Sequence, residues 1–194
     1  MPDYFPAFLD LRGRRCLVVG GGRVGERKVQ DLLACAARVT VVSPAMTPAL
    51  AELAAAGTID RCARRFRSSD ARGCTLVIAA TGAPRVDRAV VAAARRYRAI
   101  VNVVDRPEVC DFIFGSVLRR GELQIAVSTG GRSPALAREI RRRLEPQFGP
   151  GYAELVEQVG MARSRARAAA RTPAARLEAG ELVAIRVFEG RDNL

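Results

Sequence analysis

Short apolar runs alternate with longer stretches of helical periodicity over the first 105 residues of the chain. The runs predict strands at 16–19, 39–42, 58–62, 75–79 and 100–104, and the longer stretches predict helices at 24–36, 49–56 and about 85–98. Each predicted strand is nearly continuous in apolar residues, which is typical of a parallel sheet covered on both faces. We therefore expect an α/β fold with a Rossmann-like, doubly wound parallel sheet.

The pattern changes beyond residue 112. Apolar runs at 112–119 and 123–127 flank Arg120-Gly121-Glu122, which predicts a β-hairpin, and Ser133 with Pro134 predicts the start of a helix over 135–144. A hairpin and one helix are too small to bury their own apolar faces, so we expect residues 113–149 to form a small α+β dimerisation segment of a homodimer. Residues 150–194 are predicted to form a helical C-terminal region.

Gly20, Gly22 and Gly25 form a G-x-G-x-x-G pattern between the first predicted strand and the first predicted helix. There, the first glycine makes a tight turn, the second lets the backbone approach a pyrophosphate, and the third lets the helix pack on the strand. The helix start also presents free N–H groups to an anion. The pattern favours a dinucleotide site over a purely structural turn, and it predicts residues 1–112 as an NAD-binding domain.

The residue that ends the second predicted strand bears on which dinucleotide binds. Ser43 stands 18 residues beyond Gly25, where such domains usually carry an acidic residue for the adenine ribose. Serine can still hydrogen-bond a ribose, and no arginine follows at once to hold a 2′-phosphate. NAD is therefore preferred over NADP as the predicted cofactor.

The net charge of +12 suits a polyanionic partner, although composition alone does not separate this from a generally arginine-rich sequence. The basic tract 163–171 has no interleaved aromatics and the chain has no tryptophan, which favours a solvated helix face over nucleic-acid binding. No basic segment precedes an apolar stretch at the N-terminus, and no apolar run approaches membrane-spanning length. We expect a soluble, cytoplasmic protein that binds neither nucleic acid nor membrane.

The chain has no histidine, which limits proton transfer to carboxylate, Tyr, Lys or Cys. Asp105 follows the last predicted strand at the end where ligands bind, which makes it the leading general-base candidate. A turn-forming role in Asp105-Arg106-Pro107-Glu108 is an equal alternative, and Glu108 and Asp111 are nearby competitors. The five cysteines contain no C-x-x-C pair, so neither a structural metal site nor a disulfide framework is predicted.

A polar, glycine-containing segment precedes the helix predicted over 135–144. Its candidate ligand-binding residues are Ser128, Thr129, Gly130, Gly131 and Ser133. Hydroxyls and N–H groups at a helix start hold carboxylates or phosphates in many proteins. An ordinarily capped helix explains the same residues equally well.

Five segments taken together resemble the precorrin-2 dehydrogenase/sirohydrochlorin ferrochelatase module of siroheme synthase. They are 5–11, the glycine turn 18–28, Ile78-Ala79-Ala80-Thr81, Asn102-Val103-Val104-Asp105 and 127–134. The matches run in the family's order from residue 5 to about 150. Asn-Val-Val-Asp and Ser-x-Gly-Gly-x-Ser-Pro are not general features of dinucleotide-binding folds.

The resemblance implies NAD-dependent oxidation of precorrin-2 to sirohydrochlorin, a step of siroheme and porphyrin biosynthesis. In bifunctional members it also implies a lyase activity, ferrochelatase, which inserts Fe²⁺ to give siroheme. The resemblance further implies a homodimer built through the segment after the nucleotide-binding domain, and a tetrapyrrole substrate whose eight carboxylates would match the positive charge. The chain ends before any methyltransferase half, which predicts a stand-alone enzyme supplied by a separate methyltransferase.

By position, the resemblance assigns NAD contacts to Arg23, Val24, Pro44, Ala45 and Thr81. It assigns Asp105 as the base that accepts a proton as hydride leaves for the nicotinamide, and that helps to remove pyrrole protons during chelation. Ser128 and Thr129 fall in the family's substrate segment, where some members carry a phosphorylated serine at the position of Thr129. The alternative function, from another class, is a non-enzymatic NAD-responsive redox sensor that would not need Asp105.

Overall fold

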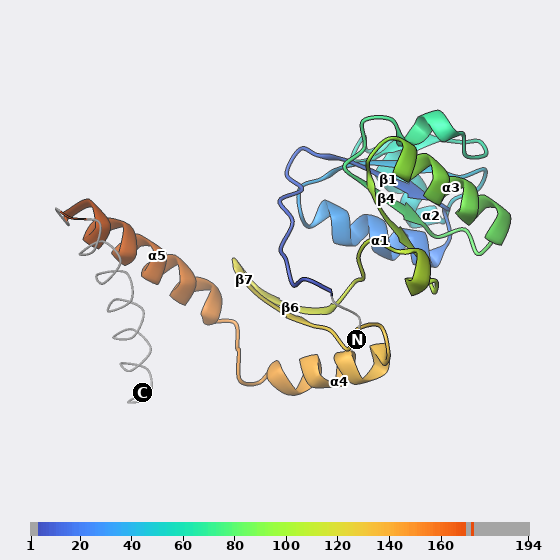
Figure 1. Ribbon diagram of the computed structural model, residues 1–194. Coiled ribbons are helices and arrows are strands. Elements are labelled where there is room, and N and C mark those ends of the chain that lie inside the picture. Colours follow the sequence, from blue (N-terminus) through green and yellow to red (C-terminus); the bar gives the residue numbers. More distant parts are fainter. Residues whose placement is uncertain (1–3, 170–171, 173–194) are drawn as a thin grey trace. The chain divides into compact units, whose positions relative to one another are not determined.

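The computed structural model describes residues 4–169 and residue 172 (Figure 1). The chain divides into two compact units, one that ends at Ile113 and one that begins at Phe114. Each unit is described by itself.

The first unit is built on a five-stranded parallel sheet with the strand order β3-β2-β1-β4-β5. The central strand β1 pairs in register with β2 and β4, so that Val18 lies opposite Val41 and Ile78. This arrangement confirms the predicted α/β fold with a Rossmann-like sheet. The elements are β1 (Arg15–Val19), α1 (Arg23–Leu33), β2 (Arg38–Val42), α2 (Pro48–Ala55), β3 (Asp60–Cys62), the 3₁₀ turn η1 (Ser68–Ala71), β4 (Leu76–Ala79), α3 (Pro84–Arg96), β5 (Ile100–Val103) and the 3₁₀ turn η2 (Pro107–Val109).

Alternate residues of the strands serve two hydrophobic clusters on opposite faces of the sheet. Leu17 of β1 belongs to the cluster that contains Val90 of α3. Its neighbour Val18 belongs to the cluster that contains Val29 of α1 and Leu50 of α2. Because both faces are buried, the strands read as continuous apolar runs rather than as an alternating pattern.

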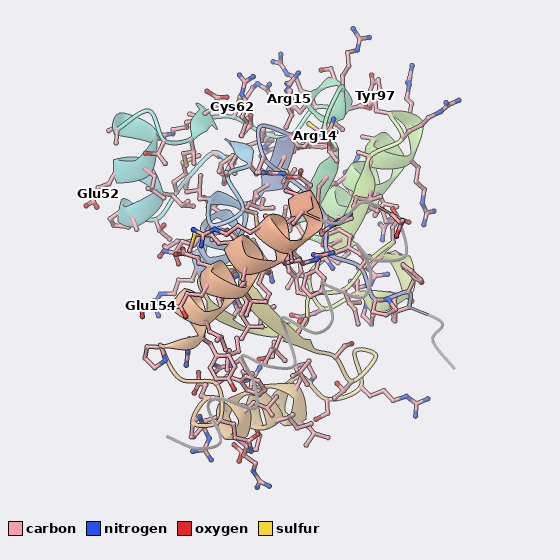
Figure 2. All side chains as sticks on the ribbon, turned by 90° about the vertical axis from the view of Figure 1, so that its left-hand side faces the viewer. Arg14, Arg15, Glu52, Cys62, Tyr97 and Glu154 are labelled. Atoms are coloured by element: carbon pink, nitrogen blue, oxygen red, sulfur yellow. The ribbon has the colours of Figure 1, made fainter. Side chains whose placement is uncertain are left out.

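The helices end earlier than their periodicity predicts. Helix α1 ends at Leu33 rather than at 36, and Ala36 takes a left-handed φ of 53°. Helix α3 ends at Arg96, and its C-cap is Tyr97, which Figure 2 labels. The guanidinium groups of Arg72 and Arg96 lie 5.8 and 5.7 Å from the centroid of the Tyr97 ring. Apolar spacing continues beyond each helix, but the chain must turn there to lead into the next strand.

The second unit contains an antiparallel hairpin of β6 (Ser116–Arg120) and β7 (Leu123–Val127), followed by α4 (Pro134–Leu144) and α5 (Tyr152–Ala169). Ser133 caps α4 as predicted, since its Oγ accepts the Leu136 N–H at 3.2 Å. In the C-terminal region predicted over 150–194, residues 170, 171 and 173–194 lie outside the described residues. Residues 170 and 171 also belong to the basic tract 163–171.

Several predicted strand boundaries differ by one or two residues, and the start of the hairpin differs by four. The hairpin's first strand begins at Ser116 rather than at 112. Phe112 and Ile113 belong to the first unit instead, where the Asp111 N–H donates to the Val101 carbonyl at 2.8 Å and the Phe112 carbonyl accepts a hydrogen bond from Asn102 Nδ2 at 2.9 Å. The start of this apolar run thus packs on the sheet of the first unit rather than extending the hairpin.

Neither a membrane-spanning helix nor a metal-ligand cluster occurs in the described part of the chain. Its helices lack the length and apolarity that a bilayer crossing requires. Over the same residues, no three or more Cys, Asp or Glu side chains gather where they could hold a metal ion.

Candidate functional site

The turn between β1 and α1 is closed by contacts that only glycine allows. Gly20 has a φ of +115°, and a Cβ built there would lie 2.3 Å from the Ala80 carbonyl oxygen. A Cβ on Gly25 would lie 2.3 Å from the Gly20 carbonyl oxygen. Gly21 was not among the predicted site residues, yet its Cβ would lie 2.2 Å from the Ala45 carbonyl oxygen. The run of three glycines was the signal that could have identified it.

Gly22 differs from its neighbours because its surroundings are open. It is the N-cap of α1 with a φ of −82°, and a Cβ built there would meet nothing within 4 Å. The first helical hydrogen bond runs from the Glu26 N–H to the Gly22 carbonyl at 2.9 Å. Among the described residues, the N–H groups of Arg23, Val24 and Gly25 therefore have no protein acceptor. Open space, free donors and the positive end of the helix dipole together suit an anion.

The loop after β2 lies against this turn. The Thr47 N–H donates to the Gly21 carbonyl at 2.9 Å, which holds the exposed Pro44 and Ala45 beside the glycines. Ser43 ends the strand and is only 8% exposed. The position where many dinucleotide sites carry a carboxylate therefore holds a neutral hydroxyl.

Thr81 borders the same turn from the side of β4, since a Cβ built on Gly20 would lie 3.2 Å from the Thr81 nitrogen. Its hydroxyl donates to Asp87 Oδ1 at 2.6 Å and accepts the Ala83 N–H at 3.0 Å. The hydroxyl thus holds the start of α3, and the backbone of Thr81 is what borders the glycine turn.

Asp105 lies at the same edge of the sheet as the glycine turn. The Ala80 N–H donates to the Val19 carbonyl at 2.8 Å and the Val104 N–H to the Ala79 carbonyl at 3.0 Å, so the ends of β1, β4 and β5 are adjacent. Asp105 follows at once, is exposed, and takes a left-handed φ of 59°. That conformation strains a residue with a Cβ, although aspartate tolerates it better than most. In the described part of the chain, no hydrogen bond or ion pair engages its carboxylate.

The two competing carboxylates are engaged. Glu108 forms an ion pair with Arg106 at 2.5 Å, and this hydrogen bond holds the pKa of Glu108 below its usual range. Asp111 Oδ2 accepts the Val101 N–H at 2.9 Å and so completes the edge of β5. Of the three predicted candidates, Asp105 is the one that offers an uncommitted carboxylate.

Cys110 joins the two ends of the loop that carries Asp105, and we call this point the neck of the loop. Its Sγ accepts the Val103 N–H at 3.1 Å and lies 3.3 Å from the Val103 carbonyl and 3.2 Å from the Arg106 carbonyl, to which the thiol donates. Burial raises the pKa of this thiol, which keeps it protonated and able to donate. No sequence signal identified Cys110, because its partners lie four and seven residues away across the loop.

The predicted substrate segment belongs to the second unit, between β7 and α4. Ser128 Oγ accepts the Gly130 N–H at 3.1 Å, and Thr129 Oγ1 accepts the Ser133 N–H at 3.0 Å. Gly130 and Gly131 both take left-handed φ values, 62° and 79°. The hydroxyl oxygens thus order the turn, and each hydroxyl keeps its own hydrogen for a ligand.

Comparison with known families places the first unit. The family described as "Putative NAD(P)-binding" matches residues 7–116. The chain belongs to this NAD(P)-binding family. A second family, described as "Sirohaem biosynthesis protein central", matches residues 120–147 of this NAD(P)-binding chain. The predicted dinucleotide cofactor is thereby confirmed.

Curated relatives carry the name siroheme synthase. The protein from Methylococcus capsulatus is 44% identical over 174 residues, which are 90% of this chain and 37% of the relative. That from Thioalkalivibrio sulfidiphilus is 47% identical over 157 residues, 81% of this chain and 32% of the relative. The chain therefore spans about a third of the length of these relatives. The resemblance to siroheme synthase predicted from the sequence is confirmed.

A solved structure named "SirC, precorrin-2 dehydrogenase" has the same fold. It superposes with a TM-score of 0.72 over 96% of this chain and 100% of its own, at 22% identity.

Proposed function

We propose that this NAD(P)-binding chain oxidises precorrin-2 to sirohydrochlorin with NAD as the hydride acceptor. The observation that carries the proposal is Asp105, an uncommitted carboxylate at the sheet edge that also holds the open start of α1. The siroheme synthases among its relatives and the fold neighbour named precorrin-2 dehydrogenase support the same reaction. An NAD-responsive sensor would have no use for a strained, exposed aspartate at that place.

The residues at the glycine turn fit a dinucleotide. The free N–H groups of Arg23 and Val24 would bind the pyrophosphate, for which Gly22 leaves room. Pro44 and Ala45 form an exposed wall beside it. NAD, when bound, supplies the hydride acceptor. We infer NAD rather than NADP because no arginine follows the neutral Ser43 to hold a 2′-phosphate.

The oxidation removes a hydride and a proton from the tetrapyrrole and leaves one new double bond. The hydride goes to NAD⁺, so that precorrin-2 and NAD⁺ give sirohydrochlorin, NADH and H⁺. Asp105 accepts the proton, and its carboxylate can do so without breaking a protein contact. Glu108 would first have to leave its ion pair with Arg106.

The second unit would supply substrate contacts and the dimer interface. We propose that the hydroxyls of Ser128 and Thr129 bind substrate carboxylates. Leu136 and Ile140 lie one turn apart on α4 and are 51% and 37% exposed, which supports a homodimer through this helix. Fe²⁺ as a further substrate, and a cytoplasmic location, stay predictions.

Anaerobic incubation with freshly made precorrin-2 tests the proposal. Sirohydrochlorin should form only when NAD⁺ is present, with one NADH for each molecule, as read from the absorbance spectrum. Addition of Fe²⁺ then tests chelation, since siroheme must form faster than in a control without protein. A folded, NAD-binding protein that causes no NAD-dependent spectral change would support the sensor instead. Sedimentation at several concentrations tests the dimer.

A further inference from the structure

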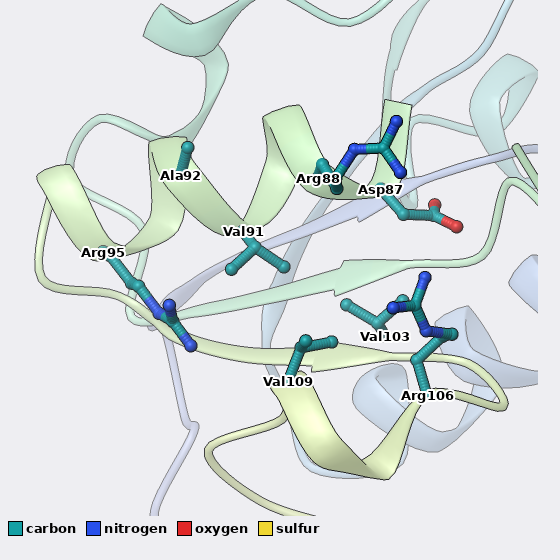
Figure 3. A pocket seen from close by; sticks show the side chains of 8 residues that line it. All are labelled: Asp87, Arg88, Val91, Ala92, Arg95, Val103, Arg106 and Val109. Atoms are coloured by element: carbon teal, nitrogen blue, oxygen red, sulfur yellow. The ribbon is translucent and has the colours of Figure 1, made fainter. Parts of the chain in front are cut away.

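A pocket of about 320 Å³ lies between α3, the end of β5 and η2 (Figure 3). Its floor is apolar and is formed by Val91, Val103 and Val109. Three arginines, Arg88, Arg95 and Arg106, also line it. None of these residues belongs to the predicted cofactor or substrate sites.

The three guanidinium groups are divided between the two ends of the pocket. Figure 3 shows Arg95 at one end, Arg88 and Arg106 at the other, and the valines between them. Arg88 and Arg95 are seven residues apart on α3, which separates their Cα atoms by about 10 Å along the helix axis. Both are exposed, and neither takes part in the ion pairs found among the described residues.

One acidic side chain lines the same pocket. Asp87 is 6% exposed, and its Oδ1 accepts the Thr81 hydroxyl at 2.6 Å. Outside the pocket, Glu108 pairs with Arg106 at 2.5 Å, which offsets part of that charge. Arg88 and Arg95 remain to give the pocket its surplus of positive charge.

We propose that this pocket binds one edge of the tetrapyrrole, with ring carbon on the valines and carboxylates on the arginines at the two ends. The inference rests on the proposed function, because only a ligand with an apolar body and several acidic arms uses both features. A volume of about 320 Å³ is small for a whole ligand of this class, so the pocket takes an edge of the macrocycle. Arg106 directly follows Asp105, with Cα atoms about 3.8 Å apart, so this end of the pocket lies next to the proposed base.

The test measures three variants of the full chain: Arg88→Gln, Arg95→Gln and the double variant that combines these two. Arg96→Gln is the matched control. Arg96 is the next residue on the same helix, carries the same charge and does not line the pocket. KM for precorrin-2 should rise about five- to tenfold in each single variant and further in the double variant, with kcat and the Kd for NAD unchanged. Arg96→Gln should match the wild type. Added salt should raise the wild-type KM and affect the double variant less.

A second measurement keeps the pocket testable if no turnover is found. Uroporphyrin, a stable tetrapyrrole polycarboxylate, is titrated into each protein without NAD and its binding is followed by absorbance. Weaker binding to the Arg88 and Arg95 variants than to Arg96→Gln supports the pocket, whatever the fate of the proposed reaction. Equal KM values and equal uroporphyrin affinity overturn it. An altered oligomeric state with unchanged ligand binding also overturns it and makes the pocket an interface between copies.

Discussion

Two loops at one edge of the sheet hold their shapes in opposite ways. The turn after β1 depends on the absence of side chains, which lets backbone segments approach closely: a Cβ on Gly20 or Gly25 would lie 2.3 Å from a carbonyl oxygen. The loop after β5 is instead held by side-chain hydrogen bonds. Cys110 Sγ accepts the Val103 N–H, and the Asp111 carboxylate accepts the Val101 N–H of β5. In the proposed function, the first loop would present backbone donors to the cofactor, whereas the second would present one carboxylate to the substrate.

The difference shows how each loop tolerates change. Backbone atoms in contact cannot move apart without displacing a strand or helix, so the glycine turn should fail as a unit. The loop after β5 has several supports, which include Asn102 Nδ2 donating to the Phe112 carbonyl at 2.9 Å. Loss of one support there should weaken the position of Asp105 without unfolding the domain.

The largest expected effect is that of Asp105→Asn. Asparagine tolerates the left-handed φ of 59°, so the loop should persist while the proton acceptor is lost. We expect kcat for precorrin-2 oxidation to fall about 10²- to 10⁴-fold with the Kd for NAD unchanged. Glu108→Gln is the matched control and should retain most activity. Equal losses in both variants would mean that loop charge, rather than Asp105, matters.

Next in size is the contrast between two alanine substitutions in the glycine turn. Gly25→Ala should lower the free energy of unfolding by about 3 kcal/mol or more, because its Cβ meets backbone. A Cβ in Gly22→Ala meets nothing within 4 Å, so the cost in stability should be about 1 kcal/mol or less, which is the difference between glycine and alanine at an N-cap. The Kd of this variant for NAD should nevertheless rise about tenfold, because the Cβ occupies the space left for the pyrophosphate. Urea unfolding and NAD titration measure the two effects, and similar instability in both variants would break the comparison.

The supports of the second loop should show a smaller effect. Cys110→Ala removes one acceptor and one donor at the neck, which should cost about 1–2 kcal/mol of stability and lower kcat several-fold. Cys110→Ser keeps both functions and should recover most of the kcat. The Kd for NAD should not change in either variant, since the glycine turn is held separately. If serine recovers stability but not kcat, the thiol does not position Asp105.

The smallest effect concerns the loop after β3, which is also held by side chains. Asp70 accepts two hydrogen bonds from Arg64, at 2.7 and 2.9 Å, and one from the Arg67 N–H at 2.8 Å. The Arg64 guanidinium is the main cause that lowers the pKa of Asp70 below its usual range. Stability from this carboxylate is therefore present above the unfolded pKa of about 4 and is lost as pH falls through the lower folded value.

Asp70→Asn should accordingly lower Tm by a few degrees at pH 7, and the gap from the wild type should narrow as the pH falls below about 4. Thermal unfolding followed by circular dichroism at several pH values measures this gap. A gap that stays constant down to pH 2 would show that the ion pair does not contribute. The Kd for NAD should be unchanged, because this loop belongs to neither predicted ligand site.

Much of the first unit could be predicted because its signals are local. Continuous apolar runs identified the five parallel strands. Helix α2 likewise begins at a local signal, since the Thr47 side chain, directly before Pro48, accepts the Leu50 N–H at 3.4 Å. The same local chemistry identified Ser133 as the cap of α4. Caps and strand runs depend on residues within a few positions of one another, so the sequence displays them directly.

Other features depended on contacts that no local pattern shows. The run that begins at 112 was predicted as a hairpin strand, but Asp111 turns the chain back along β5. Thr81 was predicted to line the cofactor site, which stays a prediction, but no local pattern shows that its hydroxyl donates to Asp87 at the start of α3. In both cases a hydrogen bond within the folded unit, rather than a local sequence pattern, determines what the residue does.

By itself, the sequence determined the parallel sheet, the glycine turn, the helix caps and the family, since periodicity and missing side chains act over short distances. Only the tertiary structure decided which of three carboxylates is uncommitted, how Cys110 holds the loop of Asp105, and that α3 and η2 enclose a pocket lined by arginines. These depend on groups far apart in the chain that meet only when the sheet assembles. The physical reason is that a hydrogen bond or cavity is set by distance in space, which composition and spacing along the chain do not encode.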